Sequence, residues 1–243
     1  MTIAIVGATG MLGSEVTRRL VVLLGRGKYR SSNVDDIGHR TLIDAAAAHG
    51  VDRFIYTSVL GAAPGHPAAF WHTKAAIEEY LIASGLTHVI LRPAAFMELH
   101  AHELIGKAVL AGKTAVILGR GERPLNFVSV RDAATFATMA ITKSEIRDVT
   151  IEIGGPDNLS RKEVAALYAR LSGRPLRVRH VPTGVVRVLG SLLGIVHPGV
   201  GGVMHASVVF EEIDQSFDPT ETLRRFPMSL TSMETFVREQ LSS

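Results

Sequence analysis

Three glycines near the N-terminus, Gly7, Gly10 and Gly13, stand at steps of three residues directly after a short apolar run over residues 3–6. Such a run is typical of a strand buried on both faces of a parallel sheet, and a helical segment follows from Met11. In a strand–turn–helix unit the first glycine permits a tight turn, the second lets the backbone approach a pyrophosphate, and the third lets the helix pack closely on the strand. The spacing predicts a dinucleotide-binding loop, and a tight turn without a ligand is the alternative.

The elements that would position this loop follow as alternating strands and helices. Apolar runs bounded by turn residues predict strands, and apolar positions at helical spacing, closed by glycines, predict helices. The predicted strands are residues 53–58, 87–91, 115–118, 126–130 and 149–153, and the predicted helices are a segment capped at Asp35 or Asp36 and ended by Gly50, residues 73–84 and residues 132–141. This alternation implies βαβ units. We therefore predict an α/β fold with a Rossmann-type, doubly wound and mainly parallel sheet.

The last third of the chain has a different pattern. Ser160 and Glu163 form a capping box that begins a helix, and Gly173 ends that helix. Residues 176–181 alternate apolar and basic side chains, which predicts a half-exposed strand. Residues 185–209 are apolar and rich in glycine. They fit either a lid over an apolar substrate or a surface for a partner or a second copy of the chain.

This change of pattern indicates two parts within one structural unit. We expect residues 1–157 to form a dinucleotide-binding, Rossmann-like domain. We expect residues 158–243 to form a smaller C-terminal lobe that packs over the substrate site and supplies part of the pocket wall.

The loop Gly7-Ala8-Thr9-Gly10-Met11-Leu12-Gly13 resembles that of the short-chain dehydrogenase/reductase superfamily, in its extended and atypical branches. Further matching segments stand in the order of the NmrA-like group of NAD(P)-binding proteins, at residues 50–58, 74–78, 84–86, 91–93 and 127–133. The resemblance covers residues 1–20 and about 33–175. It implies a Rossmann fold in which the three glycines, with Thr9, Met11 and Leu12, hold the cofactor.

The resemblance also implies catalytic positions. The family keeps a serine after the strand that ends here at Ser58, and a Tyr-x-x-x-Lys pair on the next helix. Lys74 fits the lysine, whereas the tyrosine position is Phe70, which has no proton to give. Ser58 and Lys74 are therefore the expected catalytic and cofactor-binding residues, with Phe70 in the substrate pocket. A backbone-bonded hydroxyl and a surface lysine are the alternatives.

Residues 93–97 follow a strand that, by the resemblance, ends beside the nicotinamide. Ligands of open α/β sheets bind at the carboxyl ends of the strands, which independently favours this position. We expect Pro93, Ala94 and Phe96 to contact the cofactor, and Phe96 and Met97 to line the substrate pocket. The alternative is that Phe96 and Met97 are ordinary core residues.

The front half of the chain is short for such a fold. Only 22 residues separate Gly13 from Asp36, too few for the second and third strands of the family. We expect a deletion near Leu20 or Val21, either real or due to residues absent from this sequence. The acidic residue that selects NAD, or the arginine that selects NADP, normally follows the second strand. Arg26, Lys28 and Arg30 stand in this region and favour NADP, although a solvated basic loop explains them equally well.

Composition and charge exclude several other classes of protein. The 243 residues contain no cysteine, which excludes disulfide scaffolds, thiolate metal sites and cysteine nucleophiles. The 26 basic and 23 acidic residues leave a formal charge of only +3, and no basic stripe appears, so we expect no nucleic-acid partner. Glu98, His100, His102 and Glu103 are close in sequence, but the two histidines point apart on a helix, so we expect no metal.

Targeting signals are also missing from the pattern. The N-terminal residues lack a charged region, and residues 185–209 are interrupted by charged residues, proline and glycines. A membrane-spanning helix needs about 20 apolar residues. We expect a cytoplasmic protein without a membrane partner that acts on a small molecule and can form a homodimer.

Two functions fit these observations. The first is an NAD(P)H-dependent oxidoreductase of the atypical short-chain type that reduces a small apolar carbonyl, quinone or enone. The second is a non-catalytic NAD(P)-binding redox sensor or regulatory protein of the NmrA type, which Phe70 favours because a sensor needs no catalytic acid. The glycine loop with Ser58 and Lys74 favours the enzyme.

Overall fold

The computed structural model describes residues 3–4, 36, 38–196 and 198–242, and the contacts within it divide the chain into two compact units. The first unit takes the described residues up to Pro93 together with Val130–Ile153, and the second takes Ala94–Ser129 and the described residues from Gly154 onward. The predicted glycine loop and the shortened front half lie outside the described residues.

The first unit contains a parallel sheet in the order β1-β2-β3-β7. Its strands are β1 (Ile3–Ala4), β2 (Arg53–Thr57), β3 (His88–Pro93) and β7 (Val149–Ile153). Every neighbouring pair is parallel, with Tyr56 opposite Ile90 and Leu91 opposite Ile151. The predicted parallel α/β sheet is thus confirmed in this part of the chain.

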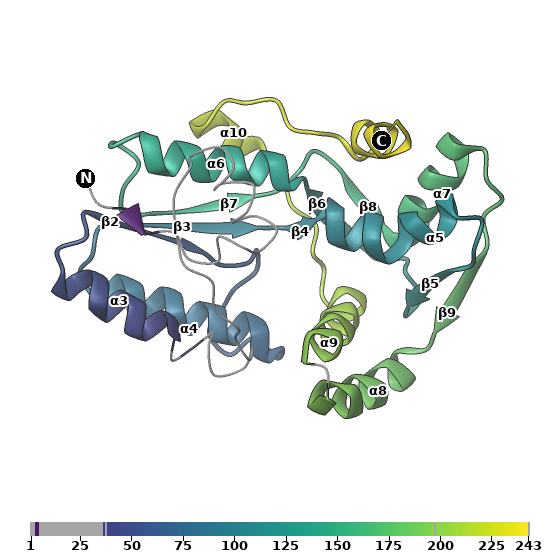
Figure 1. Ribbon diagram of the computed structural model, residues 1–243, viewed down its shortest axis with the longest axis horizontal. Coiled ribbons are helices and arrows are strands. Elements are labelled where there is room, and N and C mark those ends of the chain that lie inside the picture. Colours follow the sequence, from purple (N-terminus) through teal and green to yellow (C-terminus); the bar gives the residue numbers. More distant parts are fainter. Residues whose placement is uncertain (1–2, 5–35, 37, 197, 243) are drawn as a thin grey trace. The chain divides into compact units, whose positions relative to one another are not determined.

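Helices cover both faces of this sheet. Helices α3 (His39–Ala48) and α4 (Ala69–Ala83) lie on one face and α6 (Val130–Thr142) lies on the other (Figure 1). The core between α3, α4 and the strands is built from fully or almost fully buried side chains, namely Ile43, Phe54, Ile77, Leu81 and Ile90. This is the doubly wound arrangement that the alternating pattern predicts.

The helices α3 and α4 end near the glycines that the sequence indicated. Gly50 and Gly85 have φ values of 63° and 74°, which a residue with a side chain rarely adopts. Their starts differ from the prediction, because α3 begins at His39 without a side-chain cap and α4 begins at Ala69 rather than residue 73. Asp36 and Gly38, directly before α3, already have π-type hydrogen bonding, and Asp35 lies outside the described residues.

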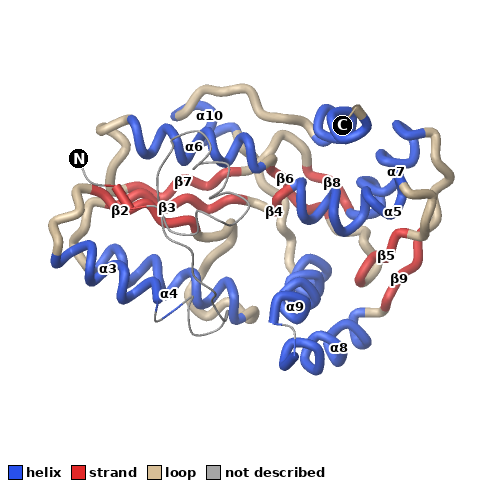
Figure 2. Tube along the Cα trace, in the orientation of Figure 1, coloured by secondary structure: helices blue, strands red, loops and turns tan. Residues whose placement is uncertain are grey.

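The second unit contains three short strand pairings (Figure 2). Strand β4 (Ala95–Phe96) pairs in parallel with β6 (Pro124–Val128), which pairs antiparallel with β8 (Asn158–Ser160). Strand β5 (Ala115–Leu118) pairs in parallel with β9 (Val178–Val181), about 60 residues later in the chain. The predicted strands at residues 115–118 and 176–181 are therefore neighbours.

The helices of the second unit include one unusual element. The helix η2 (Met97–Gly106) has π-type hydrogen bonding, and the others are α5 (Lys107–Leu110), α7 (Arg161–Ser172), α8 (Thr183–Val196), α9 (Pro198–Glu212), α10 (Thr220–Arg225) and α11 (Met233–Leu241). The predicted capping box of α7 is present, with Ser160 and Glu163 bonded reciprocally, and Gly173 ends the helix at a φ of 66°.

The division into units differs from the expected boundary between residues 157 and 158. Residues 94–129 group with the C-terminal residues because β4 and β8 both pair with β6, and because η2 packs on α7. A small lobe made only of residues 158–243 is therefore not a separate contact unit.

Candidate functional site

Ser58 lies at the carboxyl end of β2, where the sequence placed it. Its backbone N–H donates to the carbonyl of Leu91 on the neighbouring strand, at 2.7 Å. Its side chain is buried, and within the described part of the chain its Oγ has no hydrogen-bond partner. A buried hydroxyl without a partner costs about 1–3 kcal/mol, so this oxygen is suited to bonding a group other than the described residues.

Lys74 reaches the same end of β2 from helix α4. Its Nζ lies 3.4 Å from the carbonyl oxygen of Thr57, the residue next to Ser58. The ammonium also lies 5.1 Å from the centre of the Tyr56 ring and 5.6 Å from that of Phe70. Aromatic faces attract a cation at these distances. The structure thus places Lys74 beside the segment that contains Ser58.

Phe70 lies one helical turn before Lys74, in the first turn of α4. Its side chain is 48% exposed, and its ring meets that of Trp71 edge-on with centroids 5.3 Å apart. The indole Nε1 of Trp71 donates to the carbonyl of Leu60 at 3.0 Å, which ties this turn to the loop after β2. The first turn of α4 therefore presents a phenyl ring, without a proton donor, beside the lysine.

A buried ion pair holds α4 against the end of β3. Arg92 donates from Nε to Glu78 Oε1 at 2.9 Å and from Nη2 to Oε2 at 2.5 Å, and the Glu78 side chain is only 5% exposed. The hydrogen bond that Arg92 donates to Glu78 is the main reason why the pKa of Arg92 is raised, and the guanidinium also reaches Glu152. This pair joins the 74–78 and 91–93 segments, and so fixes the strand ends near Ser58.

The remaining predicted residues divide between the two units. Pro93 is buried at the end of β3, and its carbonyl accepts the N–H of Leu60 at 2.9 Å. Ala94, Phe96 and Met97 belong to the second unit, where Ala94 and Met97 are buried and Phe96 is half-buried. Met97 is fully buried as the first residue of η2, as the core alternative describes.

A family model decides the affiliation of this chain. Residues 32–237 match the model of the NmrA-like family. The chain belongs to the NmrA-like family. Among curated relatives, an NAD(P)H azoreductase of Xenophilus azovorans is 29% identical over 136 residues, which are 56% of this chain and 46% of that protein. A photosystem II assembly factor of Guillardia theta is 24% identical over 220 residues, which are 87% of this chain and 68% of that protein.

Solved structures share the fold of this NmrA-like chain. An NADPH-dependent quinone oxidoreductase of Escherichia coli, complexed with NADPH, superposes with a TM-score of 0.81 at 18% identity and covers 99% of this chain and 100% of its own. A triphenylmethane reductase of Citrobacter sp. superposes with a TM-score of 0.77 at 16% identity, and the match covers 98% of this chain and 99% of the reductase. These likenesses identify the fold as Rossmann-type α/β. The chain spans less than half of the azoreductase.

The histidines of η2 have packing partners in this NmrA-like chain. His102 Nδ1 lies 3.1 Å from the Tyr168 hydroxyl, and His100 meets Phe210 edge-on with ring centroids 5.4 Å apart. Burial and the nearby Arg161 lower the pKa of His100 to about 4, which leaves it neutral at pH 7. Across the described residues, no group of three or more histidine or acidic side chains is placed to hold a metal ion. Nor is any described helix both long and apolar enough to cross a bilayer.

Sequence reasoning missed two contributors to the site. Tyr56 provides the ring beneath Lys74, and Glu78 anchors Arg92. Both stand inside segments that the resemblance had already singled out, at residues 50–58 and 74–78. Tyr56 precedes Thr57 on β2, and Glu78 follows Lys74 by one helical turn. The i, i+4 spacing of Lys74 and Glu78 on α4 was the available signal.

Proposed function

We propose that this chain is an NAD(P)H-dependent oxidoreductase of the atypical short-chain type, which reduces a small apolar carbonyl, quinone or enone. The observation that carries the proposal is that a buried Ser58 hydroxyl, unbonded among the described residues, and the Lys74 ammonium both lie at the carboxyl end of one parallel strand. Open α/β sheets bind ligands at that edge. The reductases named above, each similar to this chain, support the same class of reaction.

The described residues fit the nicotinamide-ribose end of a dinucleotide. A bound NAD(P)H would supply a hydride to the substrate. In this proposal the Lys74 ammonium donates hydrogen bonds to ribose hydroxyls, and the Ser58 hydroxyl donates to the substrate oxygen as negative charge develops on it. Gly7, Gly10 and Gly13 hold the pyrophosphate, and Arg26, Lys28 or Arg30 favours NADP over NAD; these residues lie outside the described part.

The proton that completes the reduction cannot come from Phe70. The Lys74 ammonium is an acid of the described site, and water is another source. The charged Lys74 ammonium is attracted by the rings of Tyr56 and Phe70, whose centres lie 5.1 and 5.6 Å from Nζ. Lys74 therefore serves as electrostatic stabiliser and, where water does not act, as general acid.

The test is the oxidation of NADPH and NADH, followed at constant pH with a panel of quinones, enones and apolar aldehydes. We expect turnover with at least one acceptor, a large loss in Lys74→Met, and a smaller loss in Ser58→Ala. Lys143→Met is the matched control, because Lys143 is an exposed lysine of the same unit just after α6. Protein that binds the cofactor yet turns over no acceptor would contradict the enzymatic proposal.

A second candidate is a non-catalytic NAD(P)-binding regulator, and Phe70 is the observation that favours it. Losing the catalytic acid costs an enzyme far more than a sensor, and the similar protein of Guillardia theta is named as an assembly factor. A redox sensor must discriminate between cofactor states. Calorimetric titration with NADPH and NADP⁺ tests this, because equal affinities would remove the redox-sensing role.

A further inference from the structure

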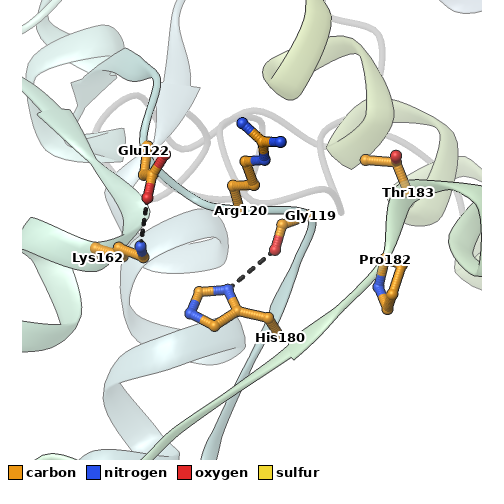
Figure 3. A pocket seen from close by; sticks show the side chains of 7 residues that line it. All are labelled: Gly119, Arg120, Glu122, Lys162, His180, Pro182 and Thr183. Carbon is orange, nitrogen blue, oxygen red and sulfur yellow. Dashed lines mark hydrogen bonds and ion pairs between the residues drawn. The ribbon is translucent and has the colours of Figure 1, made fainter.

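A pocket of about 510 Å³ lies wholly within the second unit and contains none of the residues proposed for reduction. Its lining consists of Gly119, Arg120, Glu122, Lys162, His180, Pro182 and Thr183 (Figure 3). Ligand pockets for small molecules are commonly 300–1,000 Å³, so the volume suits an organic molecule rather than a single ion. Three of its seven lining residues carry basic side chains.

Three separate elements bring these basic side chains together. Strands β5 and β9 run parallel, with Ile117 opposite His180, so both strands end at the same edge. Arg120 follows β5, and His180 is the third residue of β9. Lys162 comes from the first turn of α7, and its own backbone N–H donates to the carbonyl of Gly121 at 3.0 Å. The pocket is thus formed where two parallel strands end beside a helix start.

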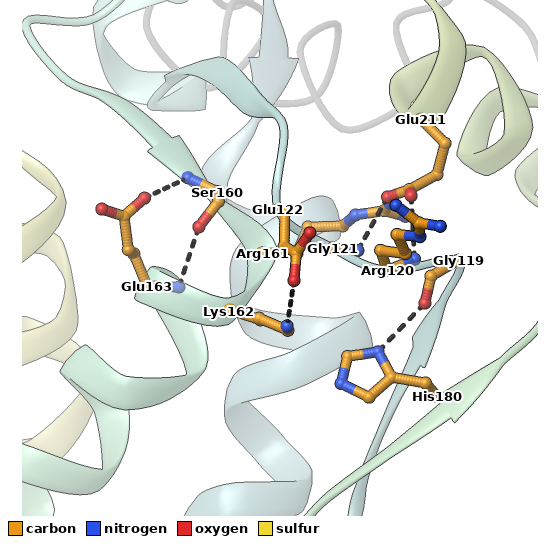
Figure 4. Close-up of polar contacts among 10 residues, drawn as sticks. All are labelled: Gly119, Arg120, Gly121, Glu122, Ser160, Arg161, Lys162, Glu163, His180 and Glu211. Atoms are coloured by element: carbon orange, nitrogen blue, oxygen red, sulfur yellow. Dashed lines mark hydrogen bonds and ion pairs between the residues drawn. The ribbon is translucent and has the colours of Figure 1, made fainter.

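The loop that carries Arg120 is held from behind by Glu211 of α9. The carboxylate of Glu211 accepts the backbone N–H groups of Arg120 and Gly121, each at 2.8 Å, and is also bonded to Arg161 (Figure 4). A side chain at Gly119, where φ is 86°, would collide with Glu211. These bonds fix the Arg120 backbone, and Arg120 is one of the residues that line the pocket (Figure 3).

The charges in this pocket are not balanced. Lys162 pairs with Glu122 at 2.6 Å, whereas the Arg120 guanidinium has no ion-pair partner among the residues the structure describes. The hydrogen bond and charge of Lys162, with the charges of Arg120 and His180, hold the pKa of Glu122 below its usual range. Among the lining residues, Arg120 and Lys162 carry positive charge, whereas Glu122 alone is acidic.

We propose that this pocket binds a small organic oxyanion, a phosphate ester or a carboxylate, through Arg120 and Lys162. The planar guanidinium of Arg120 donates two parallel hydrogen bonds to such a group, and the Lys162 ammonium adds a third. His180 Nδ1 lies 3.0 Å from the Gly119 carbonyl, which can only accept, so Nδ1 donates there and Nε2 remains for the ligand. Pro182 and Thr183 contact the organic part.

Glu122 competes with the ligand for Lys162. The Glu122 side chain is 59% exposed, so it can turn into solvent when an oxyanion takes its place. Removing its charge frees Lys162 and strengthens the positive potential. Glu122→Gln is therefore expected to tighten binding, a direction of change that loss of structure would not produce.

The experiment is calorimetric titration of the full chain at low salt with phenyl phosphate, benzoate and, as the uncharged probe, benzyl alcohol. We expect saturable binding of phenyl phosphate or benzoate and none of benzyl alcohol; the tighter of the two anions identifies the headgroup. Arg120→Ala should weaken that binding about tenfold or more, as expected for loss of a charged hydrogen-bonded partner. Glu122→Gln should tighten it several-fold.

The matched control is Arg174→Ala, which removes the same charge from an exposed arginine of the same unit outside the pocket. Its affinity for the probe should stay within about twofold of the unmodified chain, since exposed charges at a distance are screened by salt. Absence of binding for both anions, equal losses in Arg120→Ala and Arg174→Ala, or equally tight binding of benzyl alcohol would overturn the proposal.

Discussion

Glu78→Gln tests whether the buried pair with Arg92 holds α4 to the end of β3. The substitution keeps the size of the side chain but removes its charge, and the Gln amide group would face a guanidinium N–H instead of accepting from it. Breaking a buried ion pair costs about 3–5 kcal/mol. Arg92 keeps a second partner, Glu152, at 3.4 Å and is 23% exposed, so part of its charge remains solvated. We therefore expect a loss of about 2–3 kcal/mol in the free energy of unfolding.

Urea denaturation at pH 7, followed by circular dichroism, measures this loss. Glu152→Gln is the control, because that carboxylate contacts the same arginine but is 42% exposed; it should cost about 0–1 kcal/mol. Replacing both buried partners, as Glu78→Leu with Arg92→Met, should cost less than the sum of the two single changes. Equal effects of Glu78→Gln and Glu152→Gln, or a cost below about 0.5 kcal/mol for Glu78→Gln, would refute the reasoning.

Three further predictions concern α4 and α7. Phe70→Tyr adds a hydroxyl at a half-exposed ring 5.6 Å from Lys74, whose charge lowers the pKa of the new phenol. If proton supply limits the reaction, carbonyl reduction should rise by about 10²–10⁴-fold in steady-state assays, and if Lys74 or water already supplies the proton the change should be modest. Normal cofactor binding with no reduction of any carbonyl would favour the regulator. Ser160→Ala removes the N-cap of α7 and should cost about 1 kcal/mol in urea denaturation, whereas an unchanged midpoint would contradict the role of the cap. The hydrogen bond that the Ser160 backbone N–H donates to Glu163 lowers the pKa of Glu163 in the folded chain, so Glu163→Gln should lower the free energy of unfolding near pH 7. This loss should disappear as the pH falls through the lowered pKa, and a loss independent of pH would exclude the linkage.

The parallel sheet of the first unit could be predicted because its strands carry strong local signals. The run at residues 149–153 has the predicted bounds as β7 of this sheet, and the run at residues 115–118 has them as β5 of the second unit. The capping box at Ser160 likewise specifies the start of α7 through neighbouring residues alone. Features that depend on adjacent residues were accessible from the sequence.

Long-range features were not. The pairing of β5 with β9, the grouping of residues 94–129 with the C-terminal part, and the contact of Glu211 with the Gly119 loop all join segments far apart in the chain. The π-type hydrogen bonding of η2 has no sequence signal comparable to a cap or a glycine stop. The arginine between Gly119 and Gly121, directly after a strand, was the local sign of the pocket.

The central claim is that Lys74 and Ser58 mark a nicotinamide cofactor site. Fluorescence titration of the full chain with NADPH and NADH, repeated on Lys74→Met and Lys143→Met, tests this most directly. The account predicts saturable binding of at least one nucleotide, weakened about tenfold or more in Lys74→Met and unchanged in Lys143→Met. Failure of both nucleotides to bind, or equal affinity in Lys74→Met and the unmodified chain, would contradict it.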